Sequence, residues 1–408
     1  MITTMKYRLK PTKTQVAVMY RTLDVCRETY NLSLETKIVA YENSKVHLSN
    51  FDLTGMYTHA EIGKGVVHSL VIFDVARRVM RSFQNFYDKR ARFPKFKSRR
   101  QYRSFTFVQS GFKVVGDRYL RLSCIGDIRI VLHRPIVGKI KSITIKVDAC
   151  GDWWACFMVD QTAEEFHKTP RCRQTNSAVG IDLGIKNTVT LSDGTIFENP
   201  RFLQKSLKKL KRAQRRLSRK QKGSRNRNKA RLVVAKLHRK VANQRRDWQF
   251  KVANHIAQTY ACVAIEDISS KFMLKNRKLS RAASDAAWFQ FSTILEYELF
   301  KYQRESLQRV SPRNTTQKCS NCGTLVPKDL SIRVHVCPCC GFVCDRDVNA
   351  GCNVVVGMSD ELKSRYTLLK YNTATGLAEI HACGDMNLCV NDTHVDVSSV
   401  AEAGSPRL

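Results

Sequence analysis

The sequence predicts a multidomain protein in which a small β-barrel, interrupted by helices, precedes an α/β domain. Its 408 residues are enough for two or three domains of roughly 100–200 residues each. A strand pattern at residues 1–10 is followed by two helical patterns and then, from residue 104, by short strands in which apolar and polar residues alternate. From Ala178 onward, short apolar runs alternate with helical patterns, which is typical of an α/β sheet.

The charge of the chain indicates its class of partner. The formal net charge is +35, from 70 Lys and Arg against 35 Asp and Glu. Such an excess of like charge favours a nucleic-acid partner over a merely soluble basic protein. An anionic membrane is the other polyanion to consider, but no apolar run approaches the ~18 residues that a spanning helix needs. The absence of a signal-peptide pattern and the 15 scattered cysteines predict a reducing, cytoplasmic location without disulfides.

Two helices are expected between the first strand and residue 104. The first opens at Thr12–Gln15, which is a capping-box pattern. The second is predicted over residues 66–87, with an apolar stripe that we assign to the core. The stripe consists of Val66, Leu70, Phe73, Ala76, Met80, Phe83 and Phe86. The opposite face carries Arg77, Arg78, Arg81 and Lys89. In so cationic a chain we favour a contact with a nucleic-acid backbone for this face over a merely solvated surface.

Residues 91–100 interleave Phe93 and Phe96 with basic side chains after a helix break at Pro94. This composition fits contacts with single strands or with a phosphate backbone, although alone it is weakly specific. The alternating residues up to 160 then predict a small barrel or sheet, with a turn at Gly151-Asp152 between two of its strands. Residues 161–177 are interpreted as a linker.

In the second half we expect five short strands, a helical hairpin and a further helix. The strands are 179–183, 188–191, 195–197, 260–266 and 307–310, and Asp193 falls in a turn. Residues 201–250 hold 20 Lys and Arg and one acid, and their leucine seam predicts a hairpin with a cationic outer face. Residues 269–285 are expected to be a basic loop and 286–304 a helix. The acidic tail from residue 371 is expected to be disordered.

Four cysteines have the spacing of a metal site. Cys319, Cys322, Cys337 and Cys340 form two Cys-x2-Cys pairs with 14 residues between them, close to the zinc-ribbon spacing. Four thiolates complete a tetrahedral zinc shell without an open position, so we predict a structural ion. Cys339 could replace Cys340, but Gly341 favours Cys340 as the knuckle residue. His335 is interpreted as a neighbour of the site.

Three acids stand out by their positions in the sequence. Two lie where burial of a carboxylate would cost free energy, and the third begins a helix. Asp182 and Glu266 are in or at the end of apolar runs, and Asp347 begins a predicted helix. Brought together, they would form a hard oxygen site suited to magnesium. Two such ions can activate water and stabilise the leaving oxygen of a phosphodiester, so we predict that these acids are catalytic. The adjacent Asp267 and Asp345 are interpreted as helix caps or ion-pair partners.

The motifs resemble the TnpB family, the RNA-guided nucleases of insertion-sequence transposons and relatives of type V CRISPR effectors. The resemblance rests on Gly180–Ile185, Ile265–Ile268, the cysteine pairs and Asp345–Ala350, and it covers nearly the whole chain. It implies a RuvC-type RNase H fold with an inserted zinc ribbon and a wedge-type β-barrel interrupted by a helical recognition domain. The implied boundaries are 1–10 and 104–172 for the barrel, 11–103 for the recognition domain, 178–312 and 342–357 for the nuclease, 313–341 for the ribbon, and 358–408 for a largely disordered tail.

The resemblance also implies a function. Asp182, Glu266 and Asp347 match the family's catalytic positions. The family implies a guide RNA derived from the transposon end, a double-stranded DNA target cut beside a short flanking motif, and magnesium and zinc as cofactors. Gly351 departs from the family's usual alanine and His335 from its frequent tryptophan. Two alternatives stay open, a catalytically silent RNA-guided or DNA-binding regulator and an accessory transposition protein.

Overall fold

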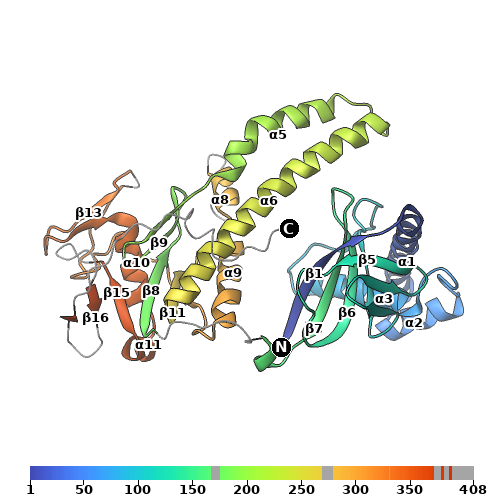
Figure 1. Cartoon of the computed structure of the whole chain (residues 1–408), viewed down its shortest axis with the longest axis horizontal. Helices are drawn as coiled ribbons and strands as arrows, with labels where there is room; N and C mark the ends of the chain where they lie inside the picture. The colour runs from blue at the N-terminus through green and yellow to red at the C-terminus, as the bar shows by residue number, and fades with distance from the viewer. Residues whose placement is uncertain (167–174, 269–278, 330, 372–377, 381–385, 388–408) are drawn as a thin grey trace. The chain divides into compact units, whose positions relative to one another are not determined.

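Residues 1–166, 175–268, 279–329, 331–371, 378–380 and 386–387 are described by the structure, a computed structural model. The chain forms two compact units, Met1–Phe166 and His167–Leu408, whose elements are labelled in Figure 1. Each unit is described separately below. None of the described helices combines the length and the apolar character that crossing a bilayer requires.

The first unit is built on one antiparallel sheet with helices inserted after its first strand. Its elements are β1 (Ile2–Lys10), α1 (Lys13–Ser44), α2 (Asn50–His59), α3 (Ser69–Tyr87), β2 (Ser104–Val108), β3 (Phe112–Val115), β4 (Tyr119–Leu122), β5 (Gly126–Val131), β6 (Lys139–Val147), β7 (Trp153–Asp160) and α4 (Ala163–Phe166). The strand order is β2-β6-β7-β1-β5-β4-β3. Because β1 pairs with both β7 and β5, the predicted interruption of the sheet by helices is confirmed.

Local signals place the boundaries of several of these elements. Thr12 caps α1, since its hydroxyl accepts from the Gln15 amide at 3.2 Å while the Gln15 side chain accepts from the Thr12 amide at 3.0 Å. This is the predicted capping box. Gly151 takes a positive φ of 84° between β6 and β7, a conformation that favours glycine in a tight turn. The predicted hairpin at this turn is confirmed.

The inserted helices and the sheet share one hydrophobic core. Tyr7, Phe105 and Phe157 from the sheet belong to the same buried cluster as Met19 of α1 and Val75 of α3. The helical segment therefore has no separate core of its own, although the family resemblance treats it as a domain. Burying one continuous apolar surface stabilises strand and helix together.

Several expectations for the helices of this unit were wrong. Helix α2 was not predicted, and α3 begins at Ser69 after a His68 cap, three residues later than expected. The buried face of α3 is rotated from the predicted stripe, since Val75 and Val79 are buried while Leu70 and Met80 are only half-buried. A helix that packs against elements on two sides buries residues on both of those sides. The helical period of 3.6 alone therefore does not decide which of two adjacent apolar stripes is buried.

Arg78 is a further correction, because it does not belong to a free basic face. Its guanidinium donates to Asp74 at 2.7 Å, to the Ser104 carbonyl at 2.7 Å and to Thr106 Oγ1 at 2.7 Å. It is half-buried and joins α3 to β2. Arg77, Arg81 and Lys89 are exposed as expected. Since Arg78 already has three partners, it is not available to a phosphate.

The second unit is a three-layer α/β structure. Its elements are β8 (Ser177–Asp182), β9 (Asn187–Leu191), β10 (Ile196–Glu198), α5 (Phe202–Ser218), α6 (Arg225–Thr259), β11 (Cys262–Glu266), α8 (Ser280–Ala286), α9 (Trp288–Lys301), β12 (Gln308–Val310), β13 (Val334–Val336), β14 (Val343–Asp345), α10 (Arg346–Val356), α11 (Asp360–Arg365), β15 (Thr367–Lys370), β16 (Ala378–Ile380) and β17 (Met386–Asn387).

Strand β8 is the centre of its sheet. One edge of β8 pairs in parallel with β11. The other edge pairs in parallel with β15 at Ser177–Ala178 and then antiparallel with β9 at Ile181–Asp182. Val179 and Ile181 of β8 face a core shared with α6 and α9. The alternate residue Ala178 packs with α10 and α11 on the opposite face. The period of two along a strand therefore separates the two helical layers.

The predicted boundary of the C-terminal tail was wrong. Residues 358–370 are not disordered, because α11 covers 360–365 and β15 pairs in parallel with β8. Leu368 and Leu369 of β15 are buried. Three apolar or β-branched residues in a row carry too little pattern to reveal a strand. Most residues beyond 371 lie outside the described residues, as do 269–278 of the expected basic loop. The expectation of a loop up to residue 285 was also wrong, because Ser280–Ala286 form α8.

The predicted basic hairpin is confirmed as α5 and α6, which Figure 1 shows extending from the sheet. Gly223-Ser224 separates the helices, and Ser224 caps α6 by accepting from the Arg227 amide at 3.1 Å. Leu210, Val241 and Trp248 of the predicted seam are buried. The cationic residues of α5 are exposed: Lys205, Lys208, Lys209, Lys211, Arg212, Arg215 and Arg216.

Candidate metal centres

Asp182 and Glu266 end two neighbouring parallel strands. Ile181 of β8 lies opposite Ile265 of β11, so the acids that follow are at equivalent positions of adjacent strands. Val179, Ile181, Val263 and Ile265 face α6 and α9. By alternation, Asp182 and Glu266 belong to the other face, which α10 covers.

Asp347 reaches this face from the first turn of α10. The helix lies against β8, because a Cβ atom on Gly180 would be 2.1 Å from the Gly351 carbonyl oxygen. Asp345 is the N-cap and accepts from the amides of Asp347 at 2.7 Å and Val348 at 3.4 Å. The interpretation of Asp345 as a cap is therefore confirmed, and its carboxylate is occupied. Asp267 is also accounted for, by an ion pair with Arg309 at 3.7 Å.

The three acids are buried and interact electrostatically. Asp182, Glu266 and Asp347 are exposed to 7%, 6% and 6%. Burial raises the pKa of Asp182 well above its usual value, and the negative charges of Glu266 and Asp347 raise it further. Burial also raises the pKa of Glu266, against a smaller lowering by Thr315. Negative charges that raise the pKa of a buried carboxyl group would favour a cation beside it.

Asp347 and Glu266 differ in their hydrogen-bond and ion-pair partners. Arg346 donates to Asp347 Oδ1 at 3.1 Å, and Arg333 lies 3.6 Å from Oδ2. By contrast, Glu266 Oε1 is buried without a hydrogen-bond partner. A buried carboxylate oxygen without a partner is costly, so Glu266 Oε1 is an atom that a cation or a hydrogen-bond donor would stabilise. Sequence inspection had not identified Arg333 or Arg346 as neighbours of the acids.

The four cysteines form the tighter cluster. In the described part of the chain, theirs is the one group of three or more Cys, His, Asp or Glu whose ligand atoms all lie within 4.8 Å of one another. Cys319 Sγ is 3.7 Å from Cys340 Sγ, and Cys322 Sγ is 3.5 Å from Cys337 Sγ. The acids do not meet that distance. The predicted set of four sulfur ligands is brought together and can hold a metal ion.

Two matching turns build the cysteine cluster. The Gly323 amide donates to the Cys319 carbonyl at 2.9 Å, and the Gly341 amide donates to the Cys337 carbonyl at 3.0 Å. Both glycines have positive φ, 80° and 71°, which explains why glycine follows each second cysteine. The second cysteine turn connects the antiparallel strands β13 and β14, and α10 begins directly after β14.

The other candidate ligands lie outside the cluster. Cys339 is exposed and is not among the four, which is consistent with the preference for Cys340. Burial raises the pKa of the Cys344 thiol to about 12. His335 is fully buried beside Lys328 and the ring of Phe342. The interpretation of His335 as a neighbour is consistent with this position.

Asn349 links the two sites and was missed as a functional residue. Its side chain accepts from the Ser320 amide at 3.0 Å and donates to the Lys318 carbonyl at 2.8 Å. Asn353, one turn later, donates to the same carbonyl at 2.6 Å. These bonds hold the first cysteine turn against α10, the helix that carries Asp347. Two asparagines at i and i+4 on one helix face were the signal available in the sequence.

Three family models match this chain. The OrfB/IS605 model, described as "Probable transposase", matches residues 158–277. A model described as "Cas12f1-like, TNB domain" matches residues 288–354, which include the cysteine cluster. A "Helix-turn-helix domain" of the same OrfB/IS605 group matches residues 1–45, which here form β1 and the single long helix α1.

Individual proteins match over most of the chain. A Streptomyces pristinaespiralis protein, "Putative RNA-guided DNA endonuclease", is 34% identical over 86% of this chain and 88% of its own length. An Escherichia coli protein, "Putative RNA-guided DNA endonuclease InsQ", is 29% identical over 86% of this chain and 90% of its own length. A protein chain in the "Cryo-EM structure of the Cas12f1-sgRNA-target DNA complex" has a TM-score of 0.55 at 15% identity and covers 83% of this chain and 82% of its own.

At 15% identity, that structure supports a shared fold alone. The S. pristinaespiralis relative is similar enough, over enough of both chains, to establish kinship. The chain therefore belongs to the OrfB/IS605 family, and its predicted resemblance to TnpB is confirmed.

Proposed function

We propose that this chain is a transposon-encoded, RNA-guided DNA endonuclease whose catalytic acids are Asp182, Glu266 and Asp347. The observation that carries the proposal is the burial of the three acids, with Glu266 and Asp347 acting electrostatically on Asp182 and with Glu266 Oε1 without a hydrogen-bond partner. The names of the two relatives support the RNA-guided cutting of DNA, and the net charge of +35 fits two nucleic-acid partners.

The donor set fits magnesium. Carboxylate oxygens are the ligands this hard cation takes from proteins. Burial and the charges of Glu266 and Asp347 raise the pKa of Asp182, and a bound cation would favour its ionised form. When bound, magnesium would activate water and stabilise the leaving oxygen of the phosphodiester. Asp182, Glu266 and Asp347 would hold it.

The chain's own residues supply orientation and charge. The Asp345 cap and the Gly180–Gly351 approach fix the start of α10, and with it Asp347. Arg346 and Arg333 form ion pairs with Asp347. These guanidinium groups also place positive charge beside the acids, and their planar fork suits phosphate oxygens.

We assign the two-layered helices around β8 to a RuvC-type nuclease domain that extends through β15. We assign the sheet and helices of the first unit to a wedge barrel and a recognition segment. The cysteine cluster would hold a structural zinc ion, because four thiolates leave no open position for substrate. Its hydrogen bonds to Asn349 give it a role in supporting α10.

Cutting and binding measured together test the proposal. Asp182→Ala is expected to abolish magnesium-dependent cutting of target plasmid while RNA and DNA binding remain. Asp267→Ala is the matched control, because this neighbouring acid is exposed on the same sheet. Persistent cutting by Asp182→Ala would refute the site. A wild-type protein that binds its RNA and target without cutting either strand would instead support the alternative, a silent regulator.

A further inference from the structure

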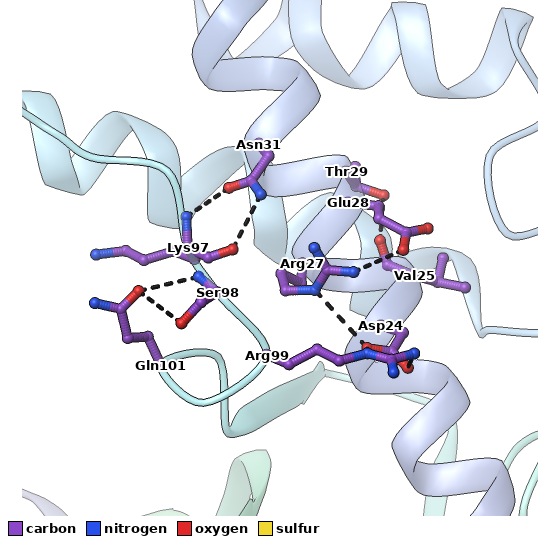
Figure 2. Close-up of polar contacts among 10 residues, drawn as sticks. All are labelled: Asp24, Val25, Arg27, Glu28, Thr29, Asn31, Lys97, Ser98, Arg99 and Gln101. Atoms are coloured by element: carbon purple, nitrogen blue, oxygen red, sulfur yellow. Dashed lines mark hydrogen bonds and ion pairs between the residues drawn. The ribbon is translucent and has the colours of Figure 1, made fainter. Parts of the chain in front are cut away.

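The segment after α3 is fixed to α1 by its backbone. Figure 2 shows Asn31 of α1 facing Lys97. The Asn31 side chain donates to the Lys97 carbonyl at 3.0 Å and accepts from the Lys97 amide at 2.7 Å. This pair of hydrogen bonds resembles the pairing of two backbones in a β-sheet and fixes the backbone at Lys97 to α1. A loop of this composition would otherwise lose much conformational entropy on binding a ligand.

Ion pairs and turns complete the attachment, as Figure 2 shows. Arg99 donates to both carboxylate oxygens of Asp24, at 2.7 and 2.5 Å. The Ser98 amide donates to the Gln101 side chain at 3.0 Å. Arg103 donates to the Arg100 carbonyl at 2.6 Å. Arg99 therefore positions the segment and is not available to a ligand.

The two phenylalanines of the segment have different surroundings. The ring of Phe93 meets those of Phe83 and Phe86 edge-on, with centroids 5.7 and 5.3 Å apart. Phe93 therefore anchors the segment to α3. Phe96 is 56% exposed and makes no ring contact among the described residues. Pro94 between them is buried, so the exposure of Phe96 is a property of a fixed segment.

The cations of the segment also separate into two groups. Arg99 is paired with Asp24, whereas Arg92, Lys95 and Arg100 are exposed. Within the described residues these three have no ion-pair partner. An exposed aromatic ring among unpaired cations is the composition that binds single-stranded nucleic acid, through stacking and phosphate contacts.

We propose that residues 92–100 form a preformed platform for an unpaired stretch of the guide RNA, with Phe96 stacking on a base and Arg92, Lys95 and Arg100 binding phosphates. This inference rests on the proposed function, in which the chain carries an RNA. Stacking needs an unpaired base, and loops, bulges and ends of RNA provide one. A DNA duplex offers none until it is opened. The contacts that fix the segment involve this chain alone, so the platform exists before any DNA is opened.

The experiment uses the full chain co-expressed with its own locus and purified as a ribonucleoprotein. Ultraviolet crosslinking followed by peptide mapping is carried out before and after addition of target DNA. We expect the peptide containing Phe96 to crosslink to RNA in the DNA-free complex. Phe96→Leu should remove this crosslink and Phe96→Trp should restore it. Phe51→Leu is the matched control, because Phe51 on α2 is 83% exposed and lies outside the segment.

Affinity gives a second measure, with the co-purified RNA transcribed in vitro as the probe. Phe96→Leu should weaken binding by about fivefold or more, the lower range for loss of one base stack. Lys95→Ala should reduce the slope of log affinity against log salt by about 0.7, as expected for one single-strand phosphate. Lys64→Ala is the control, since Lys64 already pairs with Glu61.

Three outcomes would overturn the platform. Its crosslink could appear only after target DNA is added, which would assign the segment to DNA. It could be absent while RNA co-purifies and cutting persists, which refutes this inference alone. If no RNA co-purifies, the proposed function fails and this inference fails with it.

Discussion

The cysteine cluster and the acidic site lie in the same unit but are held together by different kinds of contact. Each pair of cysteines is set by a turn of a few residues, with its own amide-to-carbonyl hydrogen bond and a glycine of positive φ. The acids come from two strands and a helix that are brought together by parallel pairing and by the approach of Gly351 to Gly180. The cluster can thus be encoded locally, whereas the acidic site exists only in the folded sheet.

The two sites also differ in how their candidate ligand atoms are arranged. The cysteine sulfurs already converge within 4.8 Å. The acids are buried, and the charges of Glu266 and Asp347 raise the pKa of Asp182. Asp347 is paired with arginines, and Glu266 Oε1 has no hydrogen-bond partner. A structural site is therefore preformed, and the proposed catalytic site depends on its ion to complete it. Four experiments follow, ordered by the size of the expected effect.

Loss of one cysteine ligand should have the largest effect. Structural zinc sites contribute on the order of 10 kcal/mol to folding in small metal-binding peptides. We expect Cys319→Ser and Cys340→Ser to lose their zinc, measured as metal per chain after dialysis. Cys339→Ser, at an exposed cysteine outside the cluster, should keep it. If Cys339→Ser loses zinc and Cys340→Ser retains it, the ligand set is wrong.

Substitution of Asp347 should separate catalysis from helix capping. Asp347→Asn is expected to reduce cutting by more than about 100-fold, the loss found for residues that merely support metal ligands. Asp345→Asn should lower the free energy of unfolding by at most about 1 kcal/mol, because asparagine also caps well, and cutting should persist. Equal loss of cutting in both variants would show that the start of α10, and not one carboxylate, is what matters.

A methyl group on Gly180 should disrupt the acidic site and spare the cysteine cluster. Its Cβ would lie 2.1 Å from the Gly351 carbonyl and 2.6 Å from the Val355 amide. We expect Gly180→Ala to destabilise the protein by about 3 kcal/mol in denaturant titration, as overpacking does, with zinc content unchanged. Gly55→Ala, with no atom within 4 Å of the new Cβ, should be neutral or stabilising. An unchanged stability for Gly180→Ala would contradict the close packing of α10 on β8.

The pH dependence should give the smallest effect and reports on Asp182. Its pKa in the folded chain is raised above the usual 3.8 by burial and by Glu266 and Asp347. The folded state therefore holds a proton more tightly than the unfolded state. Stability without magnesium should fall as pH rises from about 3.8 through the raised pKa.

Asp182→Asn should remove this part of the pH dependence in thermal denaturation without magnesium. A wild-type stability curve parallel to that of Asp182→Asn would mean that the acids do not interact as described.

Sequence alone determined the features that depend on a few neighbouring residues. The Thr12 capping box, the cysteine turns, the ends of β8 and β11 with their acids, and the break at Gly223 are each encoded within one short stretch. Hydrogen bonds and periodicity at that range leave a readable pattern. The tertiary structure decided which strands pair, which stripe of α3 is buried, and that β15 belongs to the sheet.

The engagement of Arg78 and the approach of Gly351 to Gly180 were likewise set by the tertiary structure. These features depend on contacts between segments far apart in the chain, and a residue's own neighbours in sequence carry no record of such contacts.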